Sequence, residues 1–168
     1  MAMLLAACGQ KPPAPAPARP VPPGVLSLEW VYTPATAETT AATGPLTVEP
    51  SIGAAGPQRV LRTVHGDTLE AALVGEADLA ANIELRSIAD VLELRPGARA
   101  MLYRVDAGNL CIGGQATHLI WYEPELIEGR SLALAVIAGG APGESGSTVC
   151  RVLRYTRERT GGGDGKAQ

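Results

Sequence analysis

The sequence predicts a mainly β fold: a small antiparallel meander that closes as a barrel or packs as a sandwich, with one disulfide and with one short helix as an open alternative. Short runs of β-branched, apolar and aromatic residues recur between turn residues in the C-terminal half, which is typical of such folds. A hydrophobic content of 46% with 18% charged residues indicates a packed core and not a disordered chain.

The C-terminal half carries the clearest strand patterns. We expect strands over residues 100–105, 117–122, 131–138 and 148–155. Turn residues separate them: Asp106 to Asn109, the pair Glu123-Pro124, and the Gly/Pro/Ser-rich segment 139–147. Alternation along the last strand places Val149, Arg151, Leu153 and Tyr155 on one face and Cys150, Val152 and Arg154 on the other.

The N-terminal half is less regular. Residues 25–32 are expected to form the opening strand, and residues 58–65 and 67–74 a hairpin around the turn at Gly66. Residues 33–43 are small or polar and are expected to be a loop.

Two interpretations compete for residues 75–96. Ser87 followed by Asp90 has the spacing of an N-cap with an acidic third residue, which favours a short helix. Alternation over residues 83–85 and 91–94 favours two strands instead, and this is the interpretation that we prefer.

Residues Leu5-Ala6-Ala7-Cys8 form a short apolar and small-residue run that ends in cysteine. This run resembles the lipobox of a bacterial lipoprotein. The resemblance implies cleavage before Cys8 and lipidation of its thiol, and Gly9 in place of Asp after the cysteine implies sorting to the outer membrane, facing the periplasm. A secretory signal needs a basic segment and 7–15 apolar residues, so we expect the true start codon to lie upstream of Met1.

A proline-rich segment, KPPAPAPARPVPPG, follows the lipobox at residues 11–24. A polyproline II conformation at ~3.1 Å per residue would make it a semi-rigid spacer of about 40 Å. The expected organisation is therefore a cleaved signal remnant (1–7), a lipid anchor and spacer (8–24), a single β-rich domain (25–159) and a disordered tail (160–168).

With Cys8 assigned to lipid, two cysteines remain of the chain's three. Cys111 and Cys150 are expected to form a disulfide in an oxidising envelope compartment. A reactive thiol or a metal pair are the alternatives, and the absence of a CxxC spacing and the presence of only two histidines disfavour the metal.

The charge pattern narrows the classes of partner. A net charge of −3 excludes the basic footprint of a nucleic-acid-binding domain. The expected partners are the membrane, through lipid on Cys8, and an envelope protein or a glycan, with no cofactor and no metal.

Candidate site residues are few. In a strand, Trp121 and Tyr122 point to opposite faces, so one of them would mark a contact surface if it is exposed. Glu123, Glu125 and Glu128 are expected to form a solvated acidic loop. The arginines of the last strand and its end are expected to form a solvated face: Arg151, Arg154, Arg157 and Arg159.

Two functions from different classes remain. The first, which we prefer, is a membrane-anchored envelope lipoprotein that acts as a non-enzymatic binding or interaction module. Small lipoproteins that inhibit lysozyme, and those with a META-type domain, are similar in general plan only. The alternative is a cell-wall-directed hydrolase that uses His65 or His118 with a nearby acid.

Overall fold

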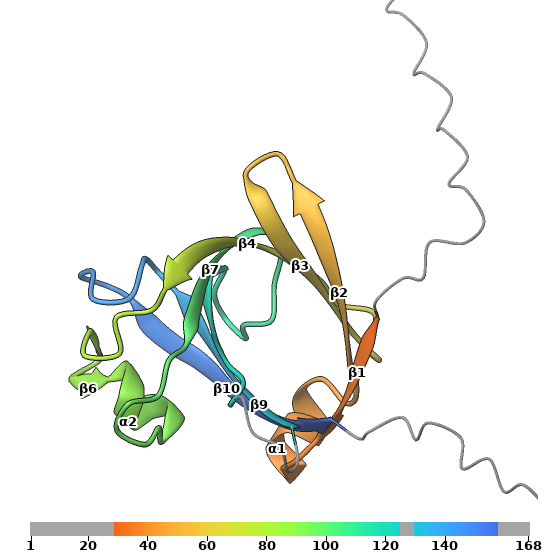
Figure 1. Ribbon diagram of the computed structural model, residues 1–168, viewed down its shortest axis with the longest axis horizontal. Helices are drawn as coiled ribbons and strands as arrows, with labels where there is room; N and C mark the ends of the chain where they lie inside the picture. The colour runs from red at the N-terminus through yellow and green to blue at the C-terminus, as the bar shows by residue number, and fades with distance from the viewer. Residues whose placement is uncertain (1–28, 125–129, 158–168) are drawn as a thin grey trace, which may run out of the picture.

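A computed structural model of the chain describes residues 29–124 and 130–157. Within these residues, eight antiparallel strands close into a barrel in the order β1-β10-β9-β8-β7-β4-β3-β2 (Figure 1). Each barrel strand pairs with the next barrel strand along the chain, and the pairing of β1 with β10 closes the ring. The predicted fold class is confirmed, and the barrel is the form that it takes.

The barrel strands are β1 Trp30–Pro34, β2 Leu46–Gly53, β3 Gly56–Thr63, β4 Thr68–Glu76, β7 Met101–Gly108, β8 Ala116–Tyr122, β9 Arg130–Ala138 and β10 Thr148–Arg157. The elements outside the barrel are helix α1 Ala37–Ala42, helix α2 Ile88–Leu92, and a two-residue ladder of β5 Asn82–Ile83 with β6 Arg86–Ser87.

The barrel interior is filled by large side chains from all around the wall. Tyr32, Trp121 and Tyr155 meet edge to face near its centre, with the Tyr32 ring 6.2 Å from Trp121 and 6.5 Å from Tyr155. Leucines and valines of the same inward alternation complete this core. The chain has no Phe, so these three residues and Tyr103 are the large aromatic side chains of the barrel core.

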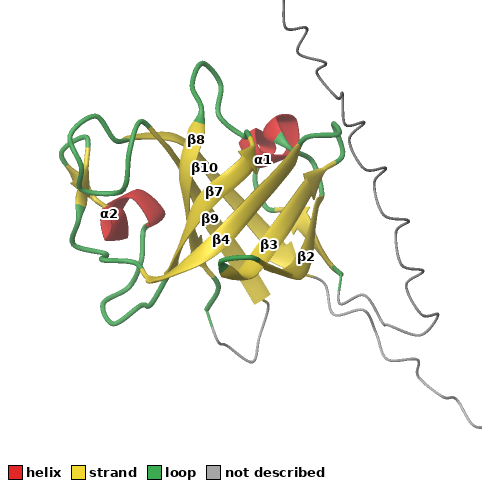
Figure 2. Cartoon of the chain, turned by 90° about the horizontal axis from the view of Figure 1, so that it is seen from above, coloured by secondary structure: helices red, strands yellow, loops and turns green. Residues whose placement is uncertain are grey.

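A second apolar core lies outside the barrel wall. Strands β8 and β9 are buried on both faces, and their outward side chains pack against α2 and its flanking segments. Figure 2 shows α2 beside the barrel wall. This explains why the sequence of β9 is apolar at nearly every position and does not alternate.

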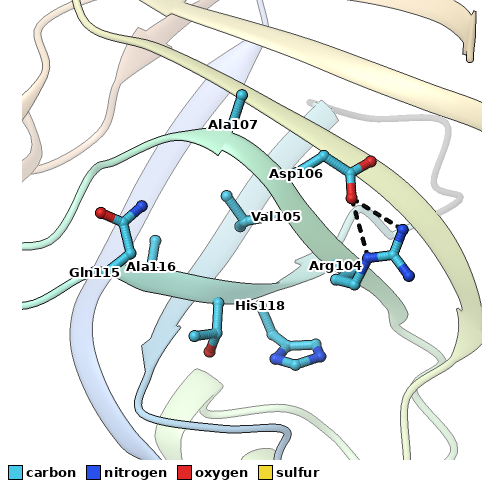
Figure 3. Close-up of a pocket in the computed structure, with 8 residues that line it drawn as sticks. Arg104, Val105, Asp106, Ala107, Gln115, Ala116 and His118 are labelled. Carbon is cyan, nitrogen blue, oxygen red and sulfur yellow. Dashed lines mark hydrogen bonds and ion pairs between the residues drawn. The ribbon is translucent and has the colours of Figure 1, made fainter. Parts of the chain in front are cut away.

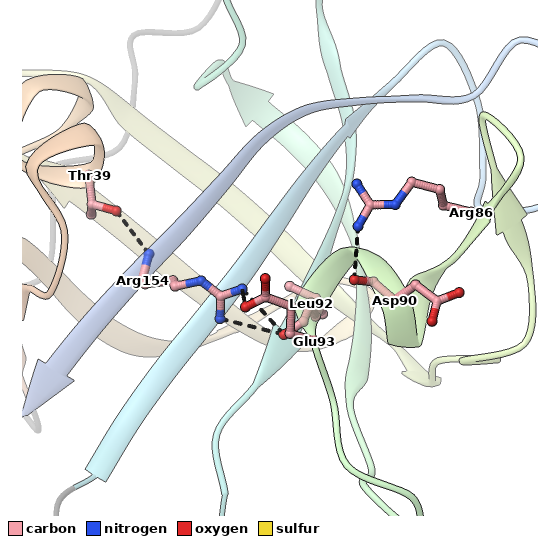
Figure 4. Close-up of polar contacts among 6 residues, drawn as sticks. All are labelled: Thr39, Arg86, Asp90, Leu92, Glu93 and Arg154. Atoms are coloured by element: carbon pink, nitrogen blue, oxygen red, sulfur yellow. Dashed lines mark hydrogen bonds and ion pairs between the residues drawn. The ribbon is translucent and has the colours of Figure 1, made fainter.

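Helix α2 is fixed at both ends. Ser87 caps its N-terminus by accepting a hydrogen bond from the backbone N–H of Asp90. At its C-terminus the Arg154 guanidinium, from β10, approaches the Leu92 carbonyl oxygen at 3.5 Å and pairs with the Glu93 carboxylate at 2.7 Å (Figure 4).

The preference for two strands in residues 75–96 was therefore partly wrong. After the end of β4 at Glu76, strand pairing is limited to β5 and β6, and the alternation at residues 91–94 belongs to the end of a helix. The Ser87 cap, together with an apolar face that contacts β9, outweighs the local alternation.

Residues 37–42, expected to be part of a loop, form helix α1. The Thr36 hydroxyl accepts a hydrogen bond from the backbone N–H of Thr39, so threonine provides the N-cap. The buried Thr39 hydroxyl in turn accepts from the backbone N–H of Arg154, and the Thr43 and Tyr155 hydroxyls bond at 2.6 Å. These contacts attach α1 to β10.

The predicted disulfide between Cys111 and Cys150 is confirmed, with a Cα–Cα distance of 5.4 Å. It joins the loop between β7 and β8 to the start of β10. Asn109 organises the same loop, because its side chain bonds to the backbone of Cys111, Gly114 and Ala116.

The barrel thus has two unlike ends. The disulfide and α1 lie at one end, where β7 finishes and β10 starts. Trp30 at the start of β1 and Arg157 at the end of β10 lie at the other, because these two strands pair antiparallel with Thr33 opposite Thr156. We call them the disulfide end and the arginine end.

Candidate binding site

At the arginine end, one guanidinium is packed among three aromatic rings. Cζ of Arg59, on β3, lies 4.4 Å from the centre of the Trp121 ring, 5.4 Å from that of Trp30 and 5.7 Å from that of Tyr103. Cζ of Arg157, on β10, lies 5.2 Å from the Trp30 ring on the same end of the barrel. We call these five residues the Arg59 cluster.

Strand alternation places these side chains together. Arg59 shares the inward face of β3 with Leu61 and Thr63, while Arg62 points outward and pairs with Glu49 at 2.7 Å. β3 starts and β8 finishes at the arginine end, so Arg59 and Trp121 both lie toward this end of the barrel.

Hydrogen bonding of Arg59 is incomplete. Its Nε donates to the Tyr103 hydroxyl at 2.8 Å. Its Nη1 is buried and has no hydrogen-bond partner. No ion pair reaches Arg59 or Arg157 within the part of the chain that the structure describes. Buried polar groups are normally hydrogen-bonded, so Nη1 of Arg59 is a donor that the described residues leave unsatisfied.

One carboxylate borders the cluster. Glu123 accepts hydrogen bonds from the Tyr32 hydroxyl at 3.0 Å and from the Trp121 indole N–H at 3.4 Å. Burial, followed by the nearby Glu123 charge, raises the pKa of Tyr32 to about 12. Glu123 lies in the loop after β8, as expected, but it is half-buried and not fully solvated, while Glu125 and Glu128 lie outside the described residues.

The arginines of the last strand do not share one solvated face. A bulge between Val149 and Arg151 turns Val149 outward, and Arg151 then follows the inward alternation of Leu153 and Tyr155. Nε of Arg151 is buried without a hydrogen-bond partner, as Nη1 of Arg59 is. Arg154 points outward to α2, and Arg159 lies outside the described residues.

Trp121 and Tyr122 point to opposite faces of β8, as the strand pattern predicts. Trp121 is 3% exposed inside the barrel, and Tyr122 is half-buried against the outer core. That either marks a contact surface with a partner stays a prediction. Cys8 lies outside the described residues.

The two histidines lie apart from the Arg59 cluster. His65 is exposed in the turn between β3 and β4. His118, on β8, is half-buried, and its Nδ1 lies 3.1 Å from the Gly140 carbonyl oxygen. A backbone carbonyl can orient an imidazole but cannot serve as its acid or nucleophile. The hydrolase hypothesis stays a prediction.

A second candidate region is an open hollow of about 410 Å³ along β7 and β8 (Figure 3). Its charged groups satisfy one another: Arg104 pairs with Asp106 at 3.0 Å, and Asp106 also accepts from Gln58. His118 lines the same hollow. With its charges paired and exposed, the hollow has weaker chemical grounds for binding than the Arg59 cluster has.

Other kinds of site receive no support from the described residues. None of their His, Cys, Asp and Glu side chains gather in a group of three or more that could hold a metal ion. None of the helices in this part of the chain is long and apolar enough to cross a membrane.

The fold and the site together define a class: a closed, eight-stranded antiparallel barrel, stapled by a disulfide at one end and lined by arginine and aromatic side chains at the other. No family model matches the chain, and no curated protein or solved structure is significantly similar to it.

Sequence reasoning missed most of the Arg59 cluster. Two of its five members were singled out: Trp121 as one of two candidates for a contact surface, and Arg157 as part of a solvated face. One signal was present: an arginine in a strand whose alternate positions hold leucine and threonine. Arg62 has the same kind of neighbours on the opposite face, so this signal alone does not say which arginine points inward.

Proposed function

We propose that this chain is a membrane-anchored envelope lipoprotein whose barrel is a non-enzymatic binding module. Lipid on Cys8 holds the chain at the outer membrane, facing the periplasm. The proline-rich segment then separates the barrel from the bilayer. The arginine end of the barrel is the part that binds.

The single observation that carries this proposal is the Cys111–Cys150 disulfide. It uses two of the three cysteines and leaves Cys8, within the lipobox-like run, as the remaining one. Disulfides persist in oxidising compartments such as the periplasm and the cell surface and are rare in the cytosol. The disulfide therefore supports export, and export is what lipidation of Cys8 requires.

The Arg59 cluster supports a binding role. Binding sites combine apolar and aromatic surface with a few polar groups that remain available to a ligand. The cluster has both, because three rings surround a guanidinium whose Nη1 has no partner.

Intact mass of the protein from the native membrane fraction tests the proposal. We expect a diacylated or triacylated mass that begins at Cys8, with two thiols that react with an alkylating agent only after reduction. The matched variant Cys8→Ser should lose the lipid and leave the membrane fraction while it keeps the disulfide. An unlipidated mass that retains Met1 and shows three free thiols would refute the proposal.

A partner search follows on the same material. Crosslinking of the lipidated protein in intact envelopes should yield a product that the Cys8→Ser variant forms poorly, because the variant is not held at the same membrane. Hydrolysis of purified cell wall by the protein, lost on His118→Ala or His65→Ala, would instead support the enzyme.

A further inference from the structure

We propose that the Arg59 cluster binds an organic carboxylate, that is, a single carboxylate group on an apolar body. The inference rests on the proposed binding function and names the ligand class for it. Three observations carry it: the unpartnered Nη1 of Arg59, the second guanidinium of Arg157 beside the same indole, and the aromatic surface around both.

The first step concerns charge. Arg59 and Arg157 both pack against Trp30, at 5.4 Å and 5.2 Å from its ring. Two like charges beside one ring in a partly buried place repel each other, and the charge of Glu123, which accepts hydrogen bonds from Tyr32 and Trp121, can offset only one of the two. An anion between the two guanidinium groups relieves this repulsion.

The second step concerns hydrogen bonding. Nε of Arg59 is committed to the Tyr103 hydroxyl, and Nη1 is left without an acceptor. A carboxylate oxygen is the acceptor that a guanidinium binds best, because its planar geometry matches the planar donor set. A dianion such as phosphate is harder to bring out of water into a half-buried aromatic site.

The third step concerns the body of the ligand. Trp30 and Arg157 are half-buried at the rim, and Tyr103 and Trp121 are buried behind them. A carboxylate reaches Nη1 of Arg59 when the Trp30 and Arg157 side chains move aside. The rest of the ligand then covers the indole of Trp30, so an apolar chain or ring gains more than a small hydrophilic acid does.

The chain provides its own reporter for this site. It contains two tryptophans, and both Trp30 and Trp121 belong to the Arg59 cluster. Tryptophan fluorescence therefore reports on this end of the barrel and on no other part of the protein.

The experiment is a fluorescence titration of the full chain carrying Cys8→Ser, so that no attached acyl chain competes. The probes are octanoate, its neutral isostere octanamide, and inorganic phosphate, all at constant ionic strength. We expect octanoate to give a saturable change with an affinity at least about tenfold higher than that of octanamide or phosphate, as expected for one charge-assisted hydrogen-bonded pair.

Three variants make the result specific. Arg59→Gln should weaken octanoate binding by about tenfold or more, and Arg157→Gln by a smaller factor. Arg62→Gln, on the same strand but pointing outward, should bind octanoate as the unmodified chain does. Circular dichroism establishes whether each variant is folded. If Arg59→Gln does not fold, the loss of affinity in Arg157→Gln still decides the test.

The inference is overturned by equal binding of octanoate and octanamide, by phosphate that binds as tightly as octanoate, by full affinity in Arg59→Gln and Arg157→Gln, or by no saturable change. The intact mass reports on the proposed envelope function separately. A lipidated protein that does not bind octanoate would refute only the proposed ligand class. An unlipidated protein that binds octanoate would refute only the proposed lipid anchor.

Discussion

Removal of the disulfide is the perturbation whose effect the structure defines most sharply. The Cys111–Cys150 bond closes a loop with a sequence separation of 39 residues. In the chain-entropy description, closing such a loop stabilises the folded state by about 4 kcal/mol, mainly by restricting the unfolded chain. A domain has roughly 5–15 kcal/mol in total, so the double variant Cys111→Ala/Cys150→Ala should remain folded but with a large loss of stability.

The expected shift in melting temperature follows from the size of the domain. Unfolding entropy near 60 °C is about 2.1 cal/mol/K per residue, which gives about 270 cal/mol/K for about 130 residues. A loss of about 4 kcal/mol then lowers Tm by about 15 °C. Far-UV circular dichroism at 20 °C should change little, because the side chain of Asn109 still holds the loop between β7 and β8.

Thermal unfolding followed by circular dichroism measures this shift. Reduction of the unmodified protein should reproduce most of the decrease, and the same reductant should not affect the double variant. A decrease of less than about 5 °C would contradict the reasoning, since it would mean that the unfolded chain is hardly restricted by the bond. A barrel signal lost at 20 °C would contradict the role given to Asn109.

Three further changes test other parts of the fold. Gly108→Ala places a Cβ against the Thr68 carbonyl oxygen at a φ of +82°, whereas Gly66→Ala has a similar φ of +90° but open space around the new Cβ. Urea unfolding should show Gly108→Ala to be less stable than Gly66→Ala by about 2 kcal/mol or more, and this difference is the cost of the collision alone. Folding raises the pKa of Tyr32 from 10.0 to about 12, so the folded state holds this proton more tightly than the unfolded state does. The free energy of unfolding should therefore fall by roughly 1–3 kcal/mol as pH increases from 10 to 12. Urea unfolding across this range should show a less steep fall in Tyr32→Phe. Arg154→Gln should speed amide hydrogen exchange in α2 by severalfold and lower overall stability by roughly 0.5–1.5 kcal/mol, and exchange that is unchanged would show that apolar packing alone holds the helix.

The strands of the C-terminal half could be predicted because their apolar runs are bounded by strong turn residues. β9 is buried on both faces, and its apolar run over residues 131–138 was predicted as a strand. The hairpin of β3 and β4 was also predicted, since Gly66 marks its turn. In these segments local pattern and tertiary contacts agree.

The helices could not be read in the same way. Residues 37–42 consist of Ala, Glu and Thr without an apolar stripe, and α1 depends on the Thr36 cap and on the bonds of Thr39 and Thr43 to β10. For α2 the Ser87 cap was visible, but only its burial against β9 decides between helix and strand. Both errors come from contacts with residues far away in the sequence.

The Arg59 cluster was out of reach for a related reason. Its aromatic and cationic members come from β1, β3, β7, β8 and β10, and only closure of the barrel brings these strands to one end. The bulge before Arg151 limits prediction in the same way, because one inserted residue changes which side chains face inward. Alternation predicts that Val149 and Arg151 share a face, whereas in the structure they point to opposite faces.

The two ends of the barrel are held by different kinds of interaction, and this difference bears on which end binds. The disulfide end is fixed by a covalent bond and by the backbone-directed bonds of Asn109, which leave little freedom to rearrange. The arginine end combines the hydrogen bonds of Arg59 and Glu123 with stacking of guanidinium groups on rings, and the stacking contacts contribute only roughly 0.5–2 kcal/mol each and can exchange for a ligand. β1 begins and β10 finishes at this same end. Under the proposed anchor and the proposed ligand site, the carboxylate would therefore be taken up at the end of the barrel where β1 begins.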